Sequence, residues 1–325
     1  SVVGWFILFP AGYLDLSKSI LFTLGFSSNF YFFLSETQYQ AVSSLFKPLI
    51  HTWSLAVEEQ YYIIFPFILI FMYKYLKNHI LKLLAIAIFF NLFLIHFSGN
   101  LNLSPPFIEK DFSYFAPAFV FDFYFLSSRF WELLFGSFLA YTEINKVKKF
   151  RDHSFHSLAS FIGFLLILFP LLFYNDKIFH PSFFTLLPII GVSLIIYFTR
   201  HENNFIKKLL SQRIIVGVGL ISYSLYLWHY PIFAFARITE FIEVDIYKKL
   251  FLGLITIILS IISYYLIESP ARNKRNKFKV ILSLNITIIF ILILFNLSVV
   301  WKNGYKNRLT ELSFNGFVLD VSPLY

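Results

Sequence analysis

Five ionisable residues lie inside strongly apolar stretches of the sequence: Glu58, Glu59, Arg129, Glu132 and His229. A charged group within a membrane span costs about 2.5–3.5 kcal/mol on insertion scales, so such groups are expected to pair or to line a wet cavity. Histidine is the side chain most easily poised to take a proton near neutral pH, and a carboxylate can orient it or balance its charge. These residue types therefore predict proton-transfer chemistry.

The spacing of these residues indicates how they could cooperate. Arg129 and Glu132 are three residues apart and would share one face of a helix, where they can pair. His51 precedes Glu58 by seven residues, which is two helical turns up one face, while Glu59 points about 100° away from Glu58.

The expected depths of these groups agree with one another. Counted from the outer ends of three helices, Glu58, the Arg129–Glu132 pair and His229 all lie roughly 8–14 Å below the outer membrane boundary at about 1.5 Å per residue. His51 and Trp53 stand at the outer mouth. We therefore expect one shared site, and the alternative is a buried polar network that only locks helices together. For His229 the flanking aromatic residues could also mark an interfacial helix end.

The composition requires a membrane setting for these helices. Of 325 residues, 58% are hydrophobic and only 14% are charged, and the mean hydropathy is +0.70. Soluble domains carry about 25% charged residues, so the composition argues against a water-soluble enzyme, and 22% aromatic residues exclude a disordered chain. Cysteine is absent, which excludes disulfides, thiolate metal sites and a cysteine nucleophile, and no metal is expected.

Apolar runs predict an all-α, polytopic transmembrane helical bundle of about ten membrane segments. The predicted segments lie near 2–14, 18–34, 53–74, 83–98, 123–142, 158–175, 184–199, 214–236, 249–268 and 280–301. The second is rich in aromatic residues and could instead be interfacial or re-entrant.

The distribution of positive charge predicts the orientation of the chain. The net charge is +9, and alternating loops divide Lys and Arg about two to one between the two sides. The basic side is then cytoplasmic and the C-terminal tail exoplasmic, as expected in a bacterial inner membrane. The positive charge is thus a topology signal, and no nucleic-acid partner is expected.

Four blocks in this order closely resemble signatures of the acyltransferase-3 family, whose members are integral membrane O-acyltransferases of O-antigen and other surface polysaccharides. The blocks are HTWSLAVEEQYY (51–62), RFWELLFG (129–136), ISYSLYLWHYP (221–231) and IESPAR (267–272). The resemblance covers about residues 1–272. It implies transfer of an acyl group, expected to be acetyl, from cytoplasmic acyl-CoA to a hydroxyl of a surface or lipid-linked glycan, in contact with membrane lipids.

The resemblance also implies roles for particular residues. His51, Glu58 and Glu59 are the expected catalytic residues. The expected substrate-binding residues are Trp53, Arg129, Glu132 and His229 on the acceptor side, and Glu268 and Arg272 on the cytoplasmic side.

The sequence departs from the family pattern at its start. The family carries a histidine, an aspartate about ten residues later and a cytoplasmic arginine pair in its first two spans, and no position here matches them. We therefore expect an N-terminally incomplete chain: a membrane domain over 1–272 that lacks these spans, a basic loop and extra helix over 273–301, and an exoplasmic tail over 302–325. A catalytically incomplete fragment is one alternative. A glycan or lipid transporter or flippase is another, although no inverted repeat supports it.

Overall fold

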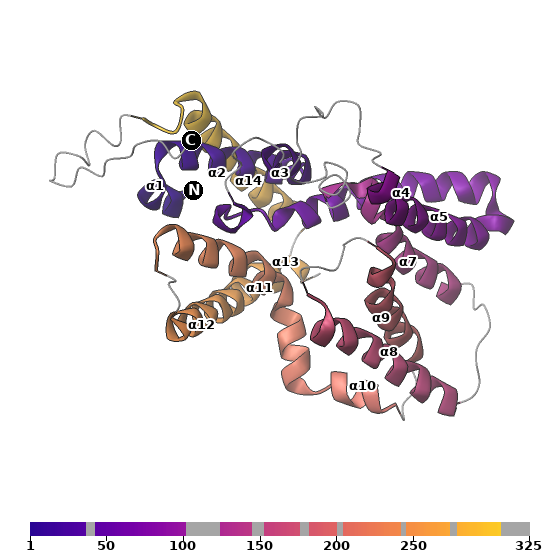
Figure 1. Cartoon of the computed structure of the whole chain (residues 1–325). Helices are drawn as coiled ribbons and strands as arrows, with labels where there is room; N and C mark the ends of the chain where they lie inside the picture. The colour runs from indigo at the N-terminus through magenta and orange to yellow at the C-terminus, as the bar shows by residue number, and fades with distance from the viewer. Residues whose placement is uncertain are drawn as a thin grey trace. The chain divides into compact units, whose positions relative to one another are not determined.

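The computed structural model describes residues 1–36, 43–101, 124–144, 153–175, 182–199, 204–241, 245–273 and 278–306, and within these ranges the chain is helical, with no strand (Figure 1). It divides into two compact units, residues 1–56 with 218–325 and residues 57–217. We call them unit 1 and unit 2 and describe each by itself. The expected loop at 99–122 and the tail lie largely outside the described residues.

Unit 1 is built from short helices at the start of the chain and long ones at its end. Its helical segments are α1 (Val2–Ile7), α2 (Pro10–Leu24), α3 (Ser28–Glu36), the 3-10 turn η1 (Ser44–Phe46), the first turn of α4 (Thr52–Tyr75), most of α11 (Arg213–Ile238), α12 (Ile246–Ser263), the π-helical turn η4 (Tyr264–Glu268), α13 (Ser269–Arg272) and α14 (Phe278–Trp301).

The helix α14 packs on α2, joining the two ends of the described chain. Tyr13 and Leu16 of α2 and Val299 of α14 form a buried core there. After α14 the chain turns at Gly304, whose φ of +74° favours glycine, and a Cβ at this position would overlap the carbonyl group of Pro10. The C-terminal helix is therefore an integral part of unit 1.

The first two predicted segments, 2–14 and 18–34, are wrong in their boundaries. The structure has three shorter helices there, and α2 runs through the break that was expected between residues 14 and 18. Pro10 accounts for the first break, because proline lacks a backbone N–H and is favoured in the first turn of a new helix. The positive φ of Phe26 marks the turn after α2.

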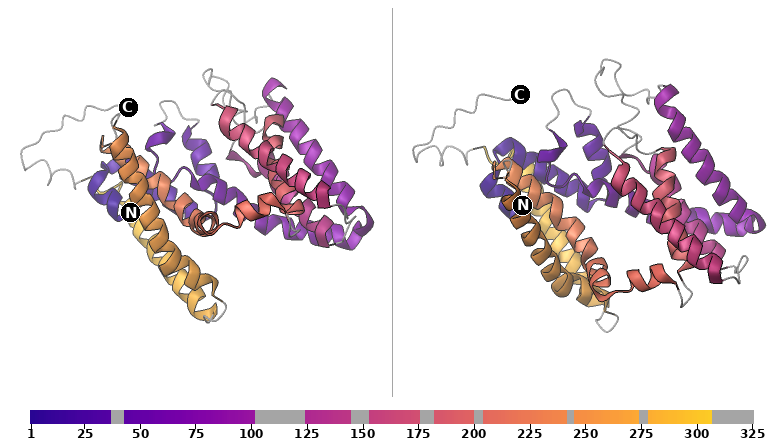
Figure 2. Two further views of the ribbon diagram at one scale, coloured as in Figure 1. Left: turned by 90° about the horizontal axis from the view of Figure 1, so that it is seen from below. Right: turned by 60° about the horizontal axis from the view of Figure 1, so that its bottom comes forward.

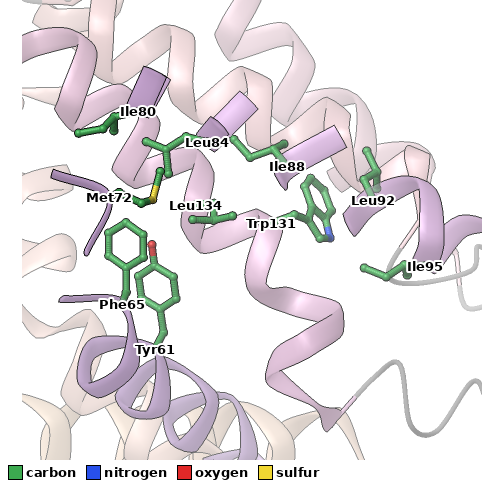
Figure 3. Close-up of a cluster of buried hydrophobic side chains, with 10 residues drawn as sticks. All are labelled: Tyr61, Phe65, Met72, Ile80, Leu84, Ile88, Leu92, Ile95, Trp131 and Leu134. Carbon is green, nitrogen blue, oxygen red and sulfur yellow. The ribbon is translucent and has the colours of Figure 1, made fainter. Parts of the chain in front are cut away.

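Unit 2 contains the remainder of α4, the 3-10 turn η2 (Lys77–His79), α5 (Ile80–Leu101), α7 (Leu126–Ile144), α8 (His153–Phe173), the 3-10 turn η3 (Phe183–Thr185), α9 (Leu186–Phe198), α10 (Phe205–Leu210) and the first residues of α11. Its main core joins α4, α5 and α7 (Figure 3). The buried members of this core are Tyr61, Phe65, Met72, Ile80, Leu84, Ile88, Leu92, Ile95, Trp131 and Leu134.

The helices α8 and α9 of unit 2 run alongside each other (Figure 2, magenta to rose). Gly163 and Gly191 face each other across this pair, and a Cβ on either would lie 2.7 Å from the carbonyl oxygen of the other. Small residues of this kind allow helix backbones to approach closely in membranes.

Five helices of the described chain are long and apolar enough to cross a membrane: Thr52–Tyr75, Lys77–His96, Phe155–Phe173, Ile246–Arg272 and Phe278–Trp301. The shorter helical stretch Phe183–Phe198 is also apolar. Large apolar side chains on these helices are exposed, for example Phe67 and Phe290, as expected of surfaces that face lipid.

Candidate functional site

His51 lies one residue before α4, in a hydrogen-bonded turn. The amide of Thr52 donates to the Leu49 carbonyl at 2.9 Å, and the amide of Trp53 donates to the Ile50 carbonyl at 3.1 Å. His51 is buried, with 6% of its surface exposed, whereas Trp53 is half-buried. The helix start therefore holds an imidazole away from bulk solvent.

Three aromatic rings of α11 surround this imidazole within unit 1. Tyr230 stacks on it, with ring centroids 5.4 Å apart and planes inclined by 16°. His229 and Tyr226 approach it edge-on, with centroids 5.4 Å and 5.2 Å away. The structure thus brings together His51 and His229, which are far apart in the sequence.

Hydrogen bonds attach α11 to the His51 segment. The Tyr226 hydroxyl donates to the backbone carbonyl of His51 at 2.5 Å and lies 2.7 Å from the Ser54 hydroxyl. The Tyr230 hydroxyl donates to the Ser44 carbonyl at 3.0 Å. Both tyrosines therefore contact the imidazole through their rings and the surrounding backbone through their hydroxyls.

The hydrogen bond of His229 identifies its tautomer. Its Nδ1 lies 2.6 Å from the backbone carbonyl oxygen of Tyr226. A carbonyl oxygen can only accept a hydrogen bond, so Nδ1 carries the hydrogen. In the neutral ring, Nε2 then keeps a lone pair that can accept a proton.

His51 is held in its neutral form. Burial, reinforced by the nearby His229, lowers the pKa of His51 to about 4. Both ring nitrogens are buried and have no hydrogen-bond partner among the described residues. A neutral imidazole has one donor and one acceptor nitrogen, so His51 can serve a ligand in both ways.

The predicted pair in unit 2 is confirmed. Arg129 Nη1 lies 2.8 Å from Glu132 Oε1, and both side chains are about one-fifth exposed. Both residues belong to α7, and Trp131 between them is fully buried in the core of unit 2. The core therefore fixes the rotation of α7 and the face that carries the ion pair.

Glu58 and Glu59 lie in α4 and are half-buried. Neither carboxylate forms an ion pair with a cation of the described ranges. Both residues, with Arg129 and Glu132, belong to unit 2, whereas His51 and His229 belong to unit 1. The single shared site expected from the sequence stays a prediction.

A second polar group in unit 1 involves Glu268 and Arg272. Arg272 Nη2 lies 2.8 Å from Glu268 Oε1, and the Ser224 hydroxyl donates to Glu268 Oε2 at 2.9 Å. Glu268 ends the π-helical turn η4, and such turns occur frequently at functional sites. The carboxylate is mostly buried, whereas 66% of the Arg272 side chain is exposed, so an anchored carboxylate presents a cation to the outside.

Sequence reasoning missed several contributors to the His51 group. Tyr226 and Tyr230 are four residues apart in the same block as His229, and this spacing places them on one helix face. The aromatic character of this block was instead attributed to a helix end at the membrane interface. Lys47, four residues before His51, is buried and paired with Glu36.

Metal ligands are not grouped in the described part of the chain. No cluster of three His, Cys, Asp or Glu residues there could hold a metal ion.

Comparisons with known proteins show which chains this one is similar to. A family model described as an acyltransferase domain matches residues 16–265, a range that includes His51 and His229. O-acetyltransferase OatA of Staphylococcus aureus (strain NCTC 8325 / PS 47) is 28% identical over 284 residues, which are 82% of this chain and 43% of OatA. The putative peptidoglycan O-acetyltransferase YrhL of Bacillus subtilis (strain 168) is 26% identical over 290 residues, or 84% of this chain and 43% of YrhL.

A putative O-acetyltransferase of S. aureus (strain COL) is 30% identical over 271 residues, which are 80% of this chain and 42% of that protein. The chain therefore spans less than half the length of these relatives. No solved structure matches it significantly.

Proposed function

Because the chain belongs to the acyltransferase family whose model matches residues 16–265, we propose that it is a membrane O-acyltransferase that moves acetyl groups from cytoplasmic acetyl-CoA to hydroxyls of a cell-envelope glycan. The observation that carries this proposal is the contact between the buried imidazole of His51 and the half-buried imidazole of His229, inside the matched range. The name of the similar protein YrhL, a putative peptidoglycan O-acetyltransferase, supports peptidoglycan as the acceptor.

The proposed reaction is an acyl transfer with general base catalysis. The acceptor hydroxyl oxygen attacks the thioester carbonyl carbon of acetyl-CoA, and the C–S bond breaks as the new C–O ester bond forms. The proton of the hydroxyl passes to Nε2 of His229, whose Nδ1–H is held by the Tyr226 carbonyl. That proton then neutralises the departing CoA thiolate.

His51 complements His229 in this scheme. Because it is neutral, its unpartnered N–H can donate to the carbonyl oxygen as negative charge develops there. Burial strengthens such a hydrogen bond, because little water competes for the donor.

The remaining polar residues are assigned to substrate binding and charge balance. We assign Glu58 and Glu59 to balancing the positive charge of the histidine that takes the proton, and Trp53 to binding the acceptor. The Arg129–Glu132 ion pair supports acceptor binding by fixing α7. The exposed guanidinium of Arg272, anchored by Glu268, suits the anionic phosphates of CoA on the cytoplasmic side.

We also propose that the protein lies in the inner membrane, with about ten segments that cross or enter the bilayer. The described helices α2, α3, α7, α9 and α11 would join the five long apolar ones. The basic loops would face the cytoplasm and the C-terminal tail the exterior, following the distribution of Lys and Arg.

Radiolabel transfer separates this function from glycan transport. Membrane vesicles that contain the protein are supplied with [14C]acetyl-CoA, and label is counted in the glycan fraction. We expect label in the glycan with the unaltered protein, a loss of label with His51→Ala or Glu58→Gln, and normal labelling with His79→Gln, which alters an exposed histidine of η2. Glycan movement across the vesicle membrane without any acetylation would refute the proposal.

A further inference from the structure

A buried lysine lies four residues before His51. Lys47 is 5% exposed, and its Nζ lies 2.7 Å from Glu36 Oε1 and donates to the Ser35 hydroxyl at 2.9 Å and the Ser35 carbonyl at 3.4 Å. These contacts match the three hydrogen-bond donors of an ammonium group. The end of α3 thus holds the Lys47 side chain in one place.

The backbone between Lys47 and His51 transmits this restraint. Proline at position 48 fixes its own φ and favours extended backbone at Lys47, whose φ and ψ are −95° and 101°. The Ile50 amide then donates to the Lys47 carbonyl at 3.2 Å, and the bonds from the Thr52 and Trp53 amides continue into α4. The position of the lysine and that of the imidazole are therefore coupled through a short, hydrogen-bonded turn.

The same segment is attached to α11 on its other side. Tyr230 donates to the Ser44 carbonyl while its ring stacks on His51, and Arg237 Nη1 donates to the Leu45 carbonyl at 3.2 Å. We call residues 44–51 the His51 strap. Lys47 is the residue that connects the middle of this strap to α3.

We propose that Lys47, through its ion pair with Glu36, is a positioning residue that keeps the His51 imidazole stacked on Tyr230 and beside His229. The effect of Lys47 on catalysis rests on the proposed function, whereas its effect on the position of the His51 ring does not. Without the ammonium group, the middle of the strap loses its attachment to α3, while the Ser28 hydroxyl of α3 still donates to the Thr52 carbonyl at 2.9 Å. The imidazole can then leave the stack and become accessible. Lys47 touches neither imidazole in this scheme and acts through the backbone.

The direct test measures the accessibility of His51 in the full protein in membranes. Diethyl pyrocarbonate modifies neutral imidazoles, and peptide mass spectrometry follows modification at His51 with the exposed His79 as an internal reference. We expect Lys47→Met to speed modification of His51 on the order of tenfold relative to His79, as expected when a buried ion pair is broken. Lys47→Arg should keep most of the protection, and the matched control Lys249→Met, an exposed lysine of α12, should leave it unchanged.

Kinetics then separate positioning from a general structural role. Acetyl transfer by Lys47→Met should show a kcat lower by about tenfold with KM little changed, because misplaced groups slow the chemical step. Lys47→Arg should recover most of kcat. If Lys47→Met does not accumulate in membranes, Glu36→Gln provides the same test, because it removes the partner charge and leaves the strap sequence intact.

The proposal is overturned if Lys47→Met, or Glu36→Gln in its place, accumulates in membranes and His51 is modified at an unchanged rate. A rise in KM with kcat retained overturns it as well. The unaltered protein could transfer no acetyl group while Lys47→Met still speeds modification of His51. That result would support the positioning role and refute only the acyltransferase function.

Discussion

The imidazole of His51 lies against the phenol ring of Tyr230, with the ring centroids 5.4 Å apart and the planes within 16° of parallel. The same tyrosine donates its hydroxyl hydrogen to the carbonyl of Ser44, at the start of the His51 strap. One side chain of α11 thus holds both the ring and the backbone that carries it.

The two contacts of Tyr230 can be separated by substitution. Tyr230→Phe keeps the stack and loses the hydrogen bond, whereas Tyr230→Leu loses both. A stacked aromatic pair and a hydrogen bond each contribute about 0.5–1.5 kcal/mol, so Phe should slow acetyl transfer modestly and Leu several-fold more. Initial rates per amount of membrane protein decide this, and equal rates for the two variants would show that the stack does not matter.

The tautomer of His229 predicts that the variants His229→Asn and His229→Gln differ in stability. The amide nitrogen of Asn occupies a place like that of Nδ1 and can still donate to the Tyr226 carbonyl, whereas the nitrogen of Gln approximates Nε2. Neither amide accepts a proton near neutral pH, so both variants should lose about a hundredfold or more of the transfer rate.

Thermal unfolding in detergent should separate these variants, because Asn preserves the anchoring hydrogen bond. We expect His229→Asn to unfold near the temperature of the unaltered protein and His229→Gln to unfold several degrees lower. A His229→Asn variant with full activity would remove Nε2 from the mechanism.

The low pKa of His51 predicts how stability depends on pH. In the unfolded chain an imidazole titrates near pH 6.5, whereas burial lowers the pKa of His51 to about 4 in the folded protein. Between these values the unfolded state binds the extra proton, so acidification from pH 6.5 to 4 destabilises the fold. The loss approaches about 3 kcal/mol at pH 4 and below.

Unfolding temperatures measured across this pH range check the prediction. His51→Gln should remove most of the acid-dependent loss, since glutamine does not titrate, while His79→Gln serves as the control. A protein whose pH dependence is the same with and without His51 would contradict the buried, neutral state of this ring.

The ion pair between Arg129 and Glu132 predicts a cost in stability. Glu132→Gln leaves the Arg129 guanidinium without this carboxylate, and the two side chains are about one-fifth exposed. We expect a destabilisation of about 1–3 kcal/mol, between the values for exposed and fully buried pairs. The double variant Arg129→Met with Glu132→Leu should restore much of it, as measured by thermal unfolding, and an equal loss in the double variant would assign the cost to packing.

The sequence predicted the long helices well because the length of an apolar run determines whether it can span a membrane. The segment expected near 53–74 is the helix Thr52–Tyr75, and that near 280–301 is Phe278–Trp301. The first two segments could not be divided correctly, because hydropathy alone does not distinguish a continuous helix from one that Pro10 restarts.

Within the candidate site, local spacing was sufficient only for local contacts. The three-residue separation of Arg129 and Glu132 predicted their pairing. The expected depth of His229 placed it below the outer mouth where His51 was expected, and the rotation of α11 about its axis depends on tertiary packing. For that reason the contacts of Tyr226 and Tyr230 with His51 could not be derived from the sequence.

The central claim is that His51 and His229 act together in acetyl transfer, and a double-mutant cycle tests it most directly. Acetyl transfer from acetyl-CoA to the glycan is measured for His51→Ala, His229→Ala and the double variant at equal membrane abundance. Residues that act as a unit are not additive, so the double variant should be no slower than the slower single variant. Losses that multiply, or either single variant at the unaltered rate, would contradict the account.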